Sequence, residues 1–268
     1  MPPATAASRT VEGDRPQRRR ARSPSLLVAA AMVLAACTAA QAPGGRPASP
    51  PTTAAAAAVA PPTTLAPGLP LPLSGRLRPG RYQWDAAKGV RVVFTLPSVN
   101  WQVQTQDRIS FTVELARRRR FTADLSGIDV IVPELVPQPA CAPHSRQRYV
   151  PAPKDMVAWL RANPCLASTT PLRSVTLAGL HGVQWSTRTD RATLEWGGWH
   201  GAEITRQQQL PGEKPQFQFL LLGHVQEIAA LDAGSNQVLV IIESPAVAPA
   251  GFRQLARAVL DGMRIQPA

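Results

Sequence analysis

The residues most able to do covalent or metal chemistry are three cysteines in a chain of 268 residues. Cys37 closes an apolar run near the N-terminus, whereas Cys141 and Cys165 lie on either side of a short predicted helix. No Cys-x-x-Cys spacing that would indicate zinc is present. The later pair can form a disulfide, can bind a metal together with His144, or can be two unrelated thiols.

An export signal surrounds Cys37. Four arginines between residues 18 and 22 precede the apolar run 26–36, and positive charge before such a run is retained on the cytoplasmic face. The run is shorter than the roughly 20 residues that cross a bilayer. It is therefore typical of a signal sequence and not of a permanent membrane helix.

The segment Leu34-Ala35-Ala36-Cys37 resembles the lipobox of bacterial lipoproteins. The resemblance implies that residues 1–36 are a lipoprotein signal peptide, that the Cys37 thiol receives a diacylglyceryl group, and that the protein is held at the extracytoplasmic side of the cell membrane. The alternative is an ordinary signal peptide, cut at a nearby small-residue site, in which Cys37 is incidental. The arginine run also suggests twin-arginine export, but the following residues do not complete that motif.

Export would place Cys141 and Cys165 in an oxidising compartment, and lipidation of Cys37 would leave them an even pair. We therefore expect a disulfide between them. It would close a loop of about 25 residues and contribute about 3 to 4 kcal/mol on the chain-entropy estimate. It would also tie a proline-rich loop to the end of the predicted helix.

The histidines and carboxylates form no recognisable catalytic or metal-binding motif. His200 and Glu203 are close in sequence, and His181 and His224 could be imagined with them, but the spacing matches no known ligand pattern. The chain has no Gly-x-Ser-x-Gly, Ser-x-x-Lys, His-Glu-x-x-His or phosphate-binding glycine loop. We expect no metal and no cofactor, although paired carboxylates can act as acid and base without a fixed spacing.

Two further features could contact a partner. Arg117, Arg118, Arg119 and Arg120 form a run between two predicted strands. Such a run is usually a solvated loop, and its functional interpretation is an anionic partner: lipid headgroups, an acidic cell-wall polymer or an envelope protein. Trp196 and Trp199 flank two glycines and could form an exposed platform for sugar rings or a peptide. Burial of both rings in the core is the alternative that the scarcity of other aromatic residues favours.

Composition divides the chain into three parts. After residues 1–36, the segment 37–75 is rich in Ala, Pro and Thr with almost no charge, which predicts a disordered tether. Fully extended, it would reach on the order of 100 Å. Residues 37–268 carry 23 basic and 15 acidic side chains, a net charge of +8. We expect no nucleic acid partner, because an exported protein rarely meets one.

The folded domain is expected at residues 76–268, and its pattern is mostly strands. Alternating or apolar runs predict strands at 90–96, 101–104, 109–115, 127–132, 174–177 and 182–188, and a hairpin formed by 225–231 and 237–243. The proline-dense segment 133–153 is predicted to be a long loop. Helices are predicted at 154–163 and from Pro249 onward. The fold class is therefore α+β, a mainly antiparallel sheet with two packed helices in a sandwich-like arrangement.

The order of these elements adds a second resemblance. Trp101 in an early strand, the helix with Val157-Ala158-Trp159-Leu160, the strand end at Val175-Thr176-Leu177-Ala178-Gly179, the late hairpin and the C-terminal helix resemble uncharacterised domains of secreted actinobacterial-type proteins. Those domains are similar to the PsbP-like α/β/α sandwich. The resemblance covers residues 80–266, rests on pattern, and implies no catalytic residues.

The sequence thus favours a lipid-anchored extracytoplasmic lipoprotein whose domain binds or scaffolds something at the cell envelope without catalysis. The alternative is a secreted hydrolase that carries no recognisable motif. A pocket lined by converging acids or histidines would favour the hydrolase, and a smooth surface would favour the binding domain.

Overall fold

The computed structural model describes residues 67–267 except 99, 117–124, 197–198 and 212–215. All of them belong to one compact unit, Ala60–Ala268. The predicted signal peptide 1–36, Cys37, most of the predicted tether 37–75, and the run Arg117–Arg120 lie outside the described residues.

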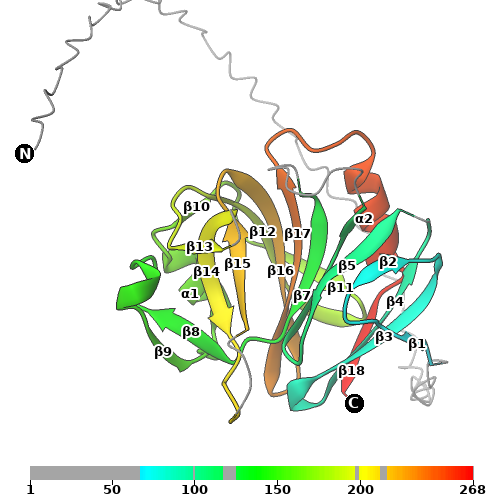
Figure 1. The fold of residues 1–268 in the computed structure, drawn as a ribbon, viewed down its shortest axis with the longest axis horizontal. Coiled ribbons are helices and arrows are strands. Elements are labelled where there is room, and N and C mark those ends of the chain that lie inside the picture. Colours follow the sequence, from blue (N-terminus) through cyan, green and yellow to red (C-terminus); the bar gives the residue numbers. More distant parts are fainter. Residues whose placement is uncertain (1–66, 99, 117–124, 197–198, 212–215, 268) are drawn as a thin grey trace, which may run out of the picture. The chain divides into compact units, whose positions relative to one another are not determined.

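The strands form three sheets (Figure 1). The four-stranded sheet has the order β1 (Leu69–Pro70), β3 (Gly80–Ala86), β4 (Val90–Leu96) and β18 (Arg264–Pro267). The large sheet has the order β10 (Leu166–Ser168), β12 (Leu180–Thr189), β16 (His224–Ala233), β17 (Asn236–Pro245), β7 (Gly127–Ile131), β6 (Ser110–Leu115), β5 (Trp101–Gln106) and β2 (Gly75–Leu77), with β11 (Arg173–Leu177) also paired to β12. The five-stranded sheet has the order β13 (Leu194–Trp196), β14 (Trp199–Arg206), β8 (Leu135–Gln138) and β9 (Arg148–Pro151), with β15 (Phe217–Leu221) also paired to β14.

Nearly every pairing is antiparallel; β1 and β3 run parallel. The α-helices are α1 (Met156–Ala162) and α2 (Phe252–Asp261), and short 3-10 turns occur at Ala87–Gly89 and His144–Arg146. The expected class, α+β with a mainly antiparallel sheet and two helices, is confirmed. In the described part of the chain, neither helix is long and apolar enough to cross a membrane.

The large sheet is buried on both faces. Alternate residues of β17 enter different cores: Val238, Val240 and Ile242 pack with α2 and the four-stranded sheet, and Leu239 and Ile241 pack with α1 and the five-stranded sheet. Because both faces are covered, β17 has a continuous run of apolar residues. A strand with one solvent-exposed face would instead alternate apolar and polar residues.

The two helices occupy their predicted places. In α2, the buried side chains of Phe252, Ala256 and Val259 form the apolar stripe that packs in the core with β4. In α1, the Asp155 carboxylate caps the N-terminus by accepting a hydrogen bond from Ala158 N at 2.8 Å, and Met156 is buried.

The predicted hairpin is also confirmed. Strands β16 and β17 pair along their whole length and are joined by Gly234–Ser235. Gly234 has a φ of +67°, the left-handed conformation that a two-residue hairpin turn requires and that glycine adopts without strain.

The prediction of a long loop at 133–153 is wrong, because β8 and β9 pair there as a short hairpin. Pro137 is tolerated in β8 because β14 meets β8 only at the pair Arg206–Leu135, so that Pro137 has a ladder partner on one side alone. Strands β1, β2, β3, β10, β13, β14, β15 and β18 were also not predicted. Ordered structure also begins before residue 76, since β1 pairs with β3.

Candidate functional site

A cavity of about 360 Å³ lies between the large sheet and the edge strand β15. Strands β5, β6, β7 and β17 line one side, and β15 with the start of β14 lines the other. A volume of this size is typical of a small-molecule site. At the cavity, polar side chains take the place of the apolar core on this face of the large sheet.

Three carboxylates converge on the cavity from neighbouring strands: Glu114 in β6, Asp129 in β7 and Glu243 in β17. Gly127 pairs with Glu114 on one side and with Glu243 on the other, and Asp129 lies two residues further along β7, on the same face. The three acidic residues are only 5 to 8% exposed. We call this site the acidic cavity.

Each carboxylate is held by hydrogen bonds. Asp129 Oδ1 accepts from Thr112 Oγ1 at 2.5 Å, and the Gln102 side-chain amide donates to Glu114. Glu243 Oε1 accepts at 2.7 Å from Leu221 N and at 2.7 Å from Gln226 Nε2. The bond from Leu221 joins the end of β15 to the large sheet, so the far wall of the cavity is attached through one of its acids.

The surroundings of Asp129 and Glu243 raise the pKa of both carboxyl groups. Burial raises the pKa of Asp129 to about 6; the negative charge of Glu114 adds to the rise and the bond from Thr112 opposes it. Burial raises the pKa of Glu243 to about 8, and the charge of Asp129 adds to it. Near pH 7 the two carboxyls together therefore hold close to one proton.

Aromatic rings and amides complete the lining. Trp199, Phe217 and Phe219 lie on the β14 and β15 side, and Gln218 Nε2 donates to Ser110 Oγ of β6 at 2.6 Å. Trp199, predicted as part of an aromatic platform, is half-buried and lines the cavity. Trp196 ends β13 directly opposite Trp199 in the β-ladder.

The predicted disulfide between Cys141 and Cys165 is confirmed, with the two Cα atoms 5.3 Å apart. Cys141 belongs to the turn that follows β8, and Cys165 lies just after α1. The bond thus ties the β8–β9 hairpin to the end of α1, as expected. It also removes the alternative in which both thiols bind a metal with His144.

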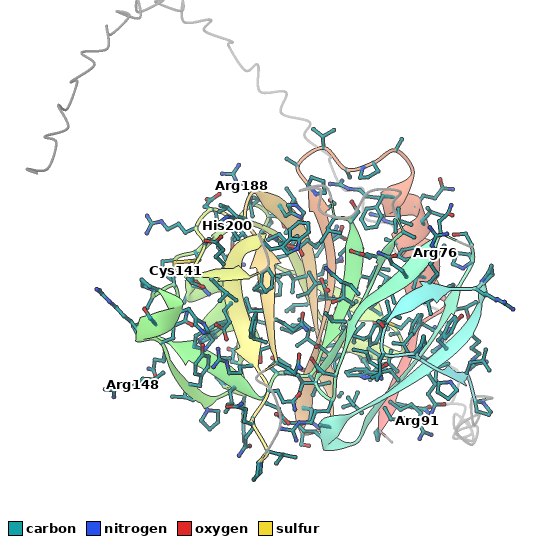
Figure 2. All side chains as sticks on the ribbon, viewed as in Figure 1. Arg76, Arg91, Cys141, Arg148, Arg188 and His200 are labelled. Atoms are coloured by element: carbon teal, nitrogen blue, oxygen red, sulfur yellow. A yellow bond between two sulfur atoms is a disulfide. The ribbon has the colours of Figure 1, made fainter. Side chains whose placement is uncertain are left out.

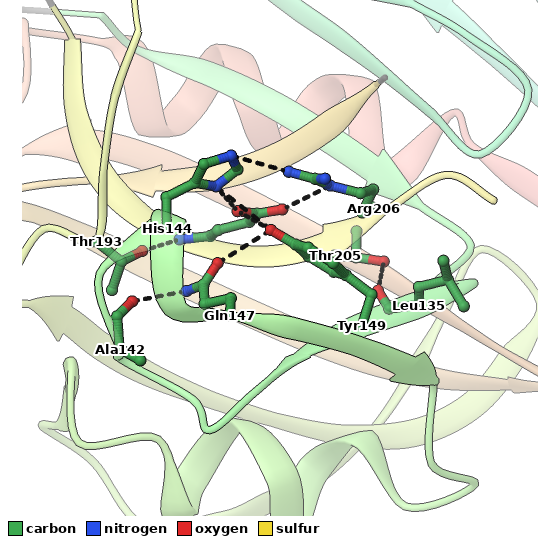
Figure 3. Close-up of polar contacts among 9 residues, drawn as sticks. Leu135, Ala142, His144, Gln147, Tyr149, Thr193, Thr205 and Arg206 are labelled. Carbon is green, nitrogen blue, oxygen red and sulfur yellow. Dashed lines mark hydrogen bonds and ion pairs between the residues drawn. The ribbon is translucent and has the colours of Figure 1, made fainter. Parts of the chain in front are cut away.

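His144 instead contacts Glu203, a fully buried residue of β14 (Figure 3). Glu203 Oε2 lies 2.8 Å from His144 Nδ1 and accepts from the Tyr149 hydroxyl at 3.0 Å, and its Oε1 lies 3.2 Å from Arg206 Nε. The Arg206 guanidinium also stacks over the Tyr149 ring, with its carbon 3.8 Å from the ring centroid. We call these four residues the Glu203 cluster.

The Glu203 cluster has a structural role. A buried carboxylate is stable only with charged or hydrogen-bonding partners, and here a cation and two donors supply them. His144 and Tyr149 come from the 3-10 turn and from β9, so the cluster holds the β8–β9 hairpin against β14. Burial and the neighbouring Glu203 raise the pKa of Tyr149, which therefore stays protonated as a donor.

The other histidines do not assemble a metal site. His200 is exposed on β14 and lies three residues before Glu203, so the two side chains point to opposite faces of the strand. His181 bonds to Thr176 at 2.9 Å, and His224 Nδ1 lies 4.0 Å from Glu243 Oε1. Among the described residues, no group of three or more His, Cys, Asp or Glu side chains is placed to share a metal ion.

The described lining of the acidic cavity contains no basic side chain. Figure 2 shows four labelled arginines at the outer edge of the domain, Arg76, Arg91, Arg148 and Arg188. None of the residues that line the cavity in the described part of the chain is a lysine or arginine. The described lining is thus acidic although the chain has a net charge of +12.

The three acids of the cavity were not predicted as site residues. A local signal was available: Asp129 is the single charged residue of the strand Gly127–Ile131, and Glu243 ends the apolar run of β17. A lone carboxylate within a buried strand is costly and often functional. Their convergence, however, depends on pairing between strands more than 100 residues apart.

Comparison of the chain with family models, curated proteins and solved structures found no match. The fold and the site together define an α+β domain with an acid-lined, aromatic-walled cavity, and its chemistry has to be inferred from the side chains that form it.

Proposed function

We propose that this protein is a lipid-anchored extracytoplasmic lipoprotein whose sandwich-like domain binds a small ligand in the acidic cavity without chemically changing it. The observation that carries the binding role is the convergence of Glu114, Asp129 and Glu243 on a cavity of about 360 Å³. Burying three carboxylates costs stability, and a ligand site is the usual reason for such a cost.

Two observations support the extracytoplasmic location. The segment Leu34-Ala35-Ala36-Cys37 resembles a lipobox and follows an export-type apolar run. Independently, the disulfide between Cys141 and Cys165 is of the kind that persists in an oxidising compartment and is rare in the cytosol. Cys37 would then be the point of attachment to the membrane.

The test of the binding role is a thermal-shift screen of the full chain in detergent against sugars, amino acids, polyamines and quaternary amines. We expect at least one class to raise the melting temperature, and we expect Asp129→Asn to abolish the shift. Glu195→Gln is the matched control, because Glu195 is an exposed acid of β13 outside the cavity. A shift that survives Asp129→Asn unchanged, or no shift with any class, contradicts the proposal.

A hydrolase is the second candidate, and one observation favours it. The pKa values of Asp129 and Glu243, about 6 and about 8, differ in the way that an acid–base pair requires: one carboxyl is ionised while its neighbour keeps a proton. In that role Glu243 would donate a proton to a leaving group and Asp129 would act as base or nucleophile. Turnover of chromogenic glycosides or esters that is lost in Glu243→Gln would support the hydrolase over the binding domain.

A further inference from the structure

We infer that a second cavity, at the hairpin end of the large sheet, binds a small molecule that carries an oxyanion, a phosphate or a carboxylate group. The cavity has a volume of about 310 Å³, and none of its described lining residues also lines the acidic cavity. We call it the lysine pocket. Its role does not depend on the ligand-binding function proposed for the acidic cavity.

Four connections meet at the lysine pocket: the turn between β3 and β4, the link from β7 to β8, the link from β9 to α1, and the turn between β16 and β17. The first and last of these lie at the same end of the domain (Figure 1), and the Asn236 side-chain amide joins them by donating to Lys88 O at 3.1 Å. The chain is described without a gap on both sides of each lining segment. The pocket is therefore a defined part of the fold.

Two lysines line the pocket, Lys88 from the turn between β3 and β4 and Lys154 from the link before α1. The 29 basic side chains of the chain include only three lysines. Two of these three thus meet at one place from distant parts of the sequence. In the described part of the chain, neither lysine forms an ion pair. Two ammonium groups without an ionic partner are suited to binding an anion.

Lys88 is held in place at the wall of the pocket. Its Nζ donates to Pro133 O at 2.7 Å, which uses one of its three N–H groups and leaves two for a ligand. Its backbone has a φ of +65°, in the left-handed region that a residue with a side chain adopts at a cost. Glycine or asparagine would suit this turn better. The local backbone therefore gives no reason for a lysine here, whereas its ammonium group does.

Neutral donors stand beside the two lysines. Gln237 Oε1 accepts from Met156 N at 3.0 Å, so the amide nitrogen of the same side chain is left to donate to a ligand. Ser235 adds a hydroxyl group from the turn between β16 and β17. An oxyanion only accepts hydrogen bonds, and this set of ammonium, amide and hydroxyl groups can donate them.

One acid, Asp232, also lines the pocket in the described part of the chain. It is exposed near the end of β16 and forms no ion pair with either of the two lysines. Because its charge opposes theirs, it should lower the affinity for an anion without preventing binding. A change at Asp232 should thus act in the opposite direction to a change at a lysine.

The size of the pocket indicates that the oxyanion belongs to a small molecule. The volume is about ten times that of one water molecule in the liquid, about 30 Å³. An inorganic ion would fill only a fraction of this space. Pro133, Ala152, Pro153 and Met156 line the remaining wall and offer apolar contact to the body of the ligand.

The experiment is calorimetry on the full chain in a non-ionic detergent with matched pairs of probes. Glycerol 3-phosphate is compared with glycerol, and succinate is compared with butane-1,4-diol. We expect at least one anion to bind more tightly than its neutral partner, with an affinity that falls as salt is added. The two anions distinguish phosphate from carboxylate as the recognised group.

Lys88→Asn and Lys154→Gln should each weaken anion binding about fivefold, and Asp232→Asn should strengthen it about threefold. Asparagine is chosen at position 88 because it tolerates the left-handed backbone. Lys154→Gln should leave the fold intact, because the Lys154 side chain forms no hydrogen bond or ion pair in the described part of the chain. Arg148→Gln is the control, since Arg148 is an exposed cation at the outer edge of the domain (Figure 2).

The inference is wrong if neither anion binds more tightly than its neutral partner. It is also wrong if an anion binds equally well to the wild type and to both lysine variants. If Arg148→Gln weakens binding as much as the lysine variants do, the anions are attracted by the positive charge of the whole chain and not by this pocket.

Discussion

The clearest prediction concerns the proton that Glu243 keeps in the folded state. Its pKa rises from 4.5 in the unfolded chain to about 8 in the fold. From about pH 6 to 7 the folded protein therefore binds a proton that the unfolded chain has lost, and the free energy of unfolding falls by about 1.4 kcal/mol per pH unit. The slope is about half of this at pH 8. This loss of stability is absent well below pH 4.5 and reaches its limit about one pH unit above 8.

Glu243→Gln is the perturbation, because glutamine has the same shape and can still accept from Leu221 N and Gln226 through its amide oxygen. It cannot ionise, so the stability of the variant relative to wild type should grow by about 2 kcal/mol from pH 6 to pH 8. Because Asp129 also titrates in this region, the difference between the two proteins is more informative than either profile alone.

The assay is urea unfolding followed by tryptophan fluorescence at pH 6, 7 and 8, with the same substitution at exposed Glu195 as control. Taking the difference between variant and wild type cancels the contribution of titratable groups that do not contact Glu243; His224, 4.0 Å from Glu243 Oε1, is not one of them. If the two profiles run parallel, Glu243 does not hold an additional proton in the fold, and the account of the acidic cavity as a desolvated cluster of acids is wrong.

Three further predictions follow from other parts of the chain. Cys37→Ala should move the protein from the membrane fraction to the soluble fraction and abolish metabolic lipid labelling; retained membrane association would contradict the lipid anchor. Replacing Arg117–Arg120 with glutamine should weaken binding to anionic liposomes at low salt, and equal binding of both forms would remove the anionic-partner hypothesis. The double change Cys141→Ala and Cys165→Ala should lower the free energy of unfolding by about 3 to 4 kcal/mol in urea titrations without changing the secondary structure seen by circular dichroism.

The local spacing of apolar residues predicted those strands and helices in which that spacing alone shows which face is buried. The alternation in 109–115 correctly placed Ile109, Phe111 and Val113 on one buried face. The same pattern gave no indication that Ser110 and Glu114 on the opposite face are buried as well. Alternation shows which residues share a face, but whether a second layer covers the other face depends on a distant part of the chain, here β15.

The region 190–223 shows why some strands were not predicted. Strand β14 contains Gly201 and the charged Glu203 in its middle, which argues locally against a buried strand. Glu203 is tolerated because Arg206, three residues later in the same strand, pairs with its charge, and because His144 and Tyr149, more than 50 residues earlier in the sequence, bond to its other oxygen. A window along β14 contains the arginine, but the two partners from the β8–β9 hairpin are tertiary and cannot be found there.

The hydrogen bond between Leu221 of β15 and Glu243 of the large sheet allows the state of the cavity to be followed by amide hydrogen exchange. Leu221 pairs with Gly201 in the ladder between β15 and β14, but its amide hydrogen is donated to the Glu243 carboxylate, and Gln226 Nε2 lies 3.4 Å from its carbonyl oxygen. Side chains of the large sheet thus hold this end of β15. The rate at which the Leu221 amide exchanges with solvent deuterium should therefore follow the charge and occupancy of Glu243. The exchange rate of this one amide hydrogen would then show whether the cavity is occupied, even before its natural ligand is identified.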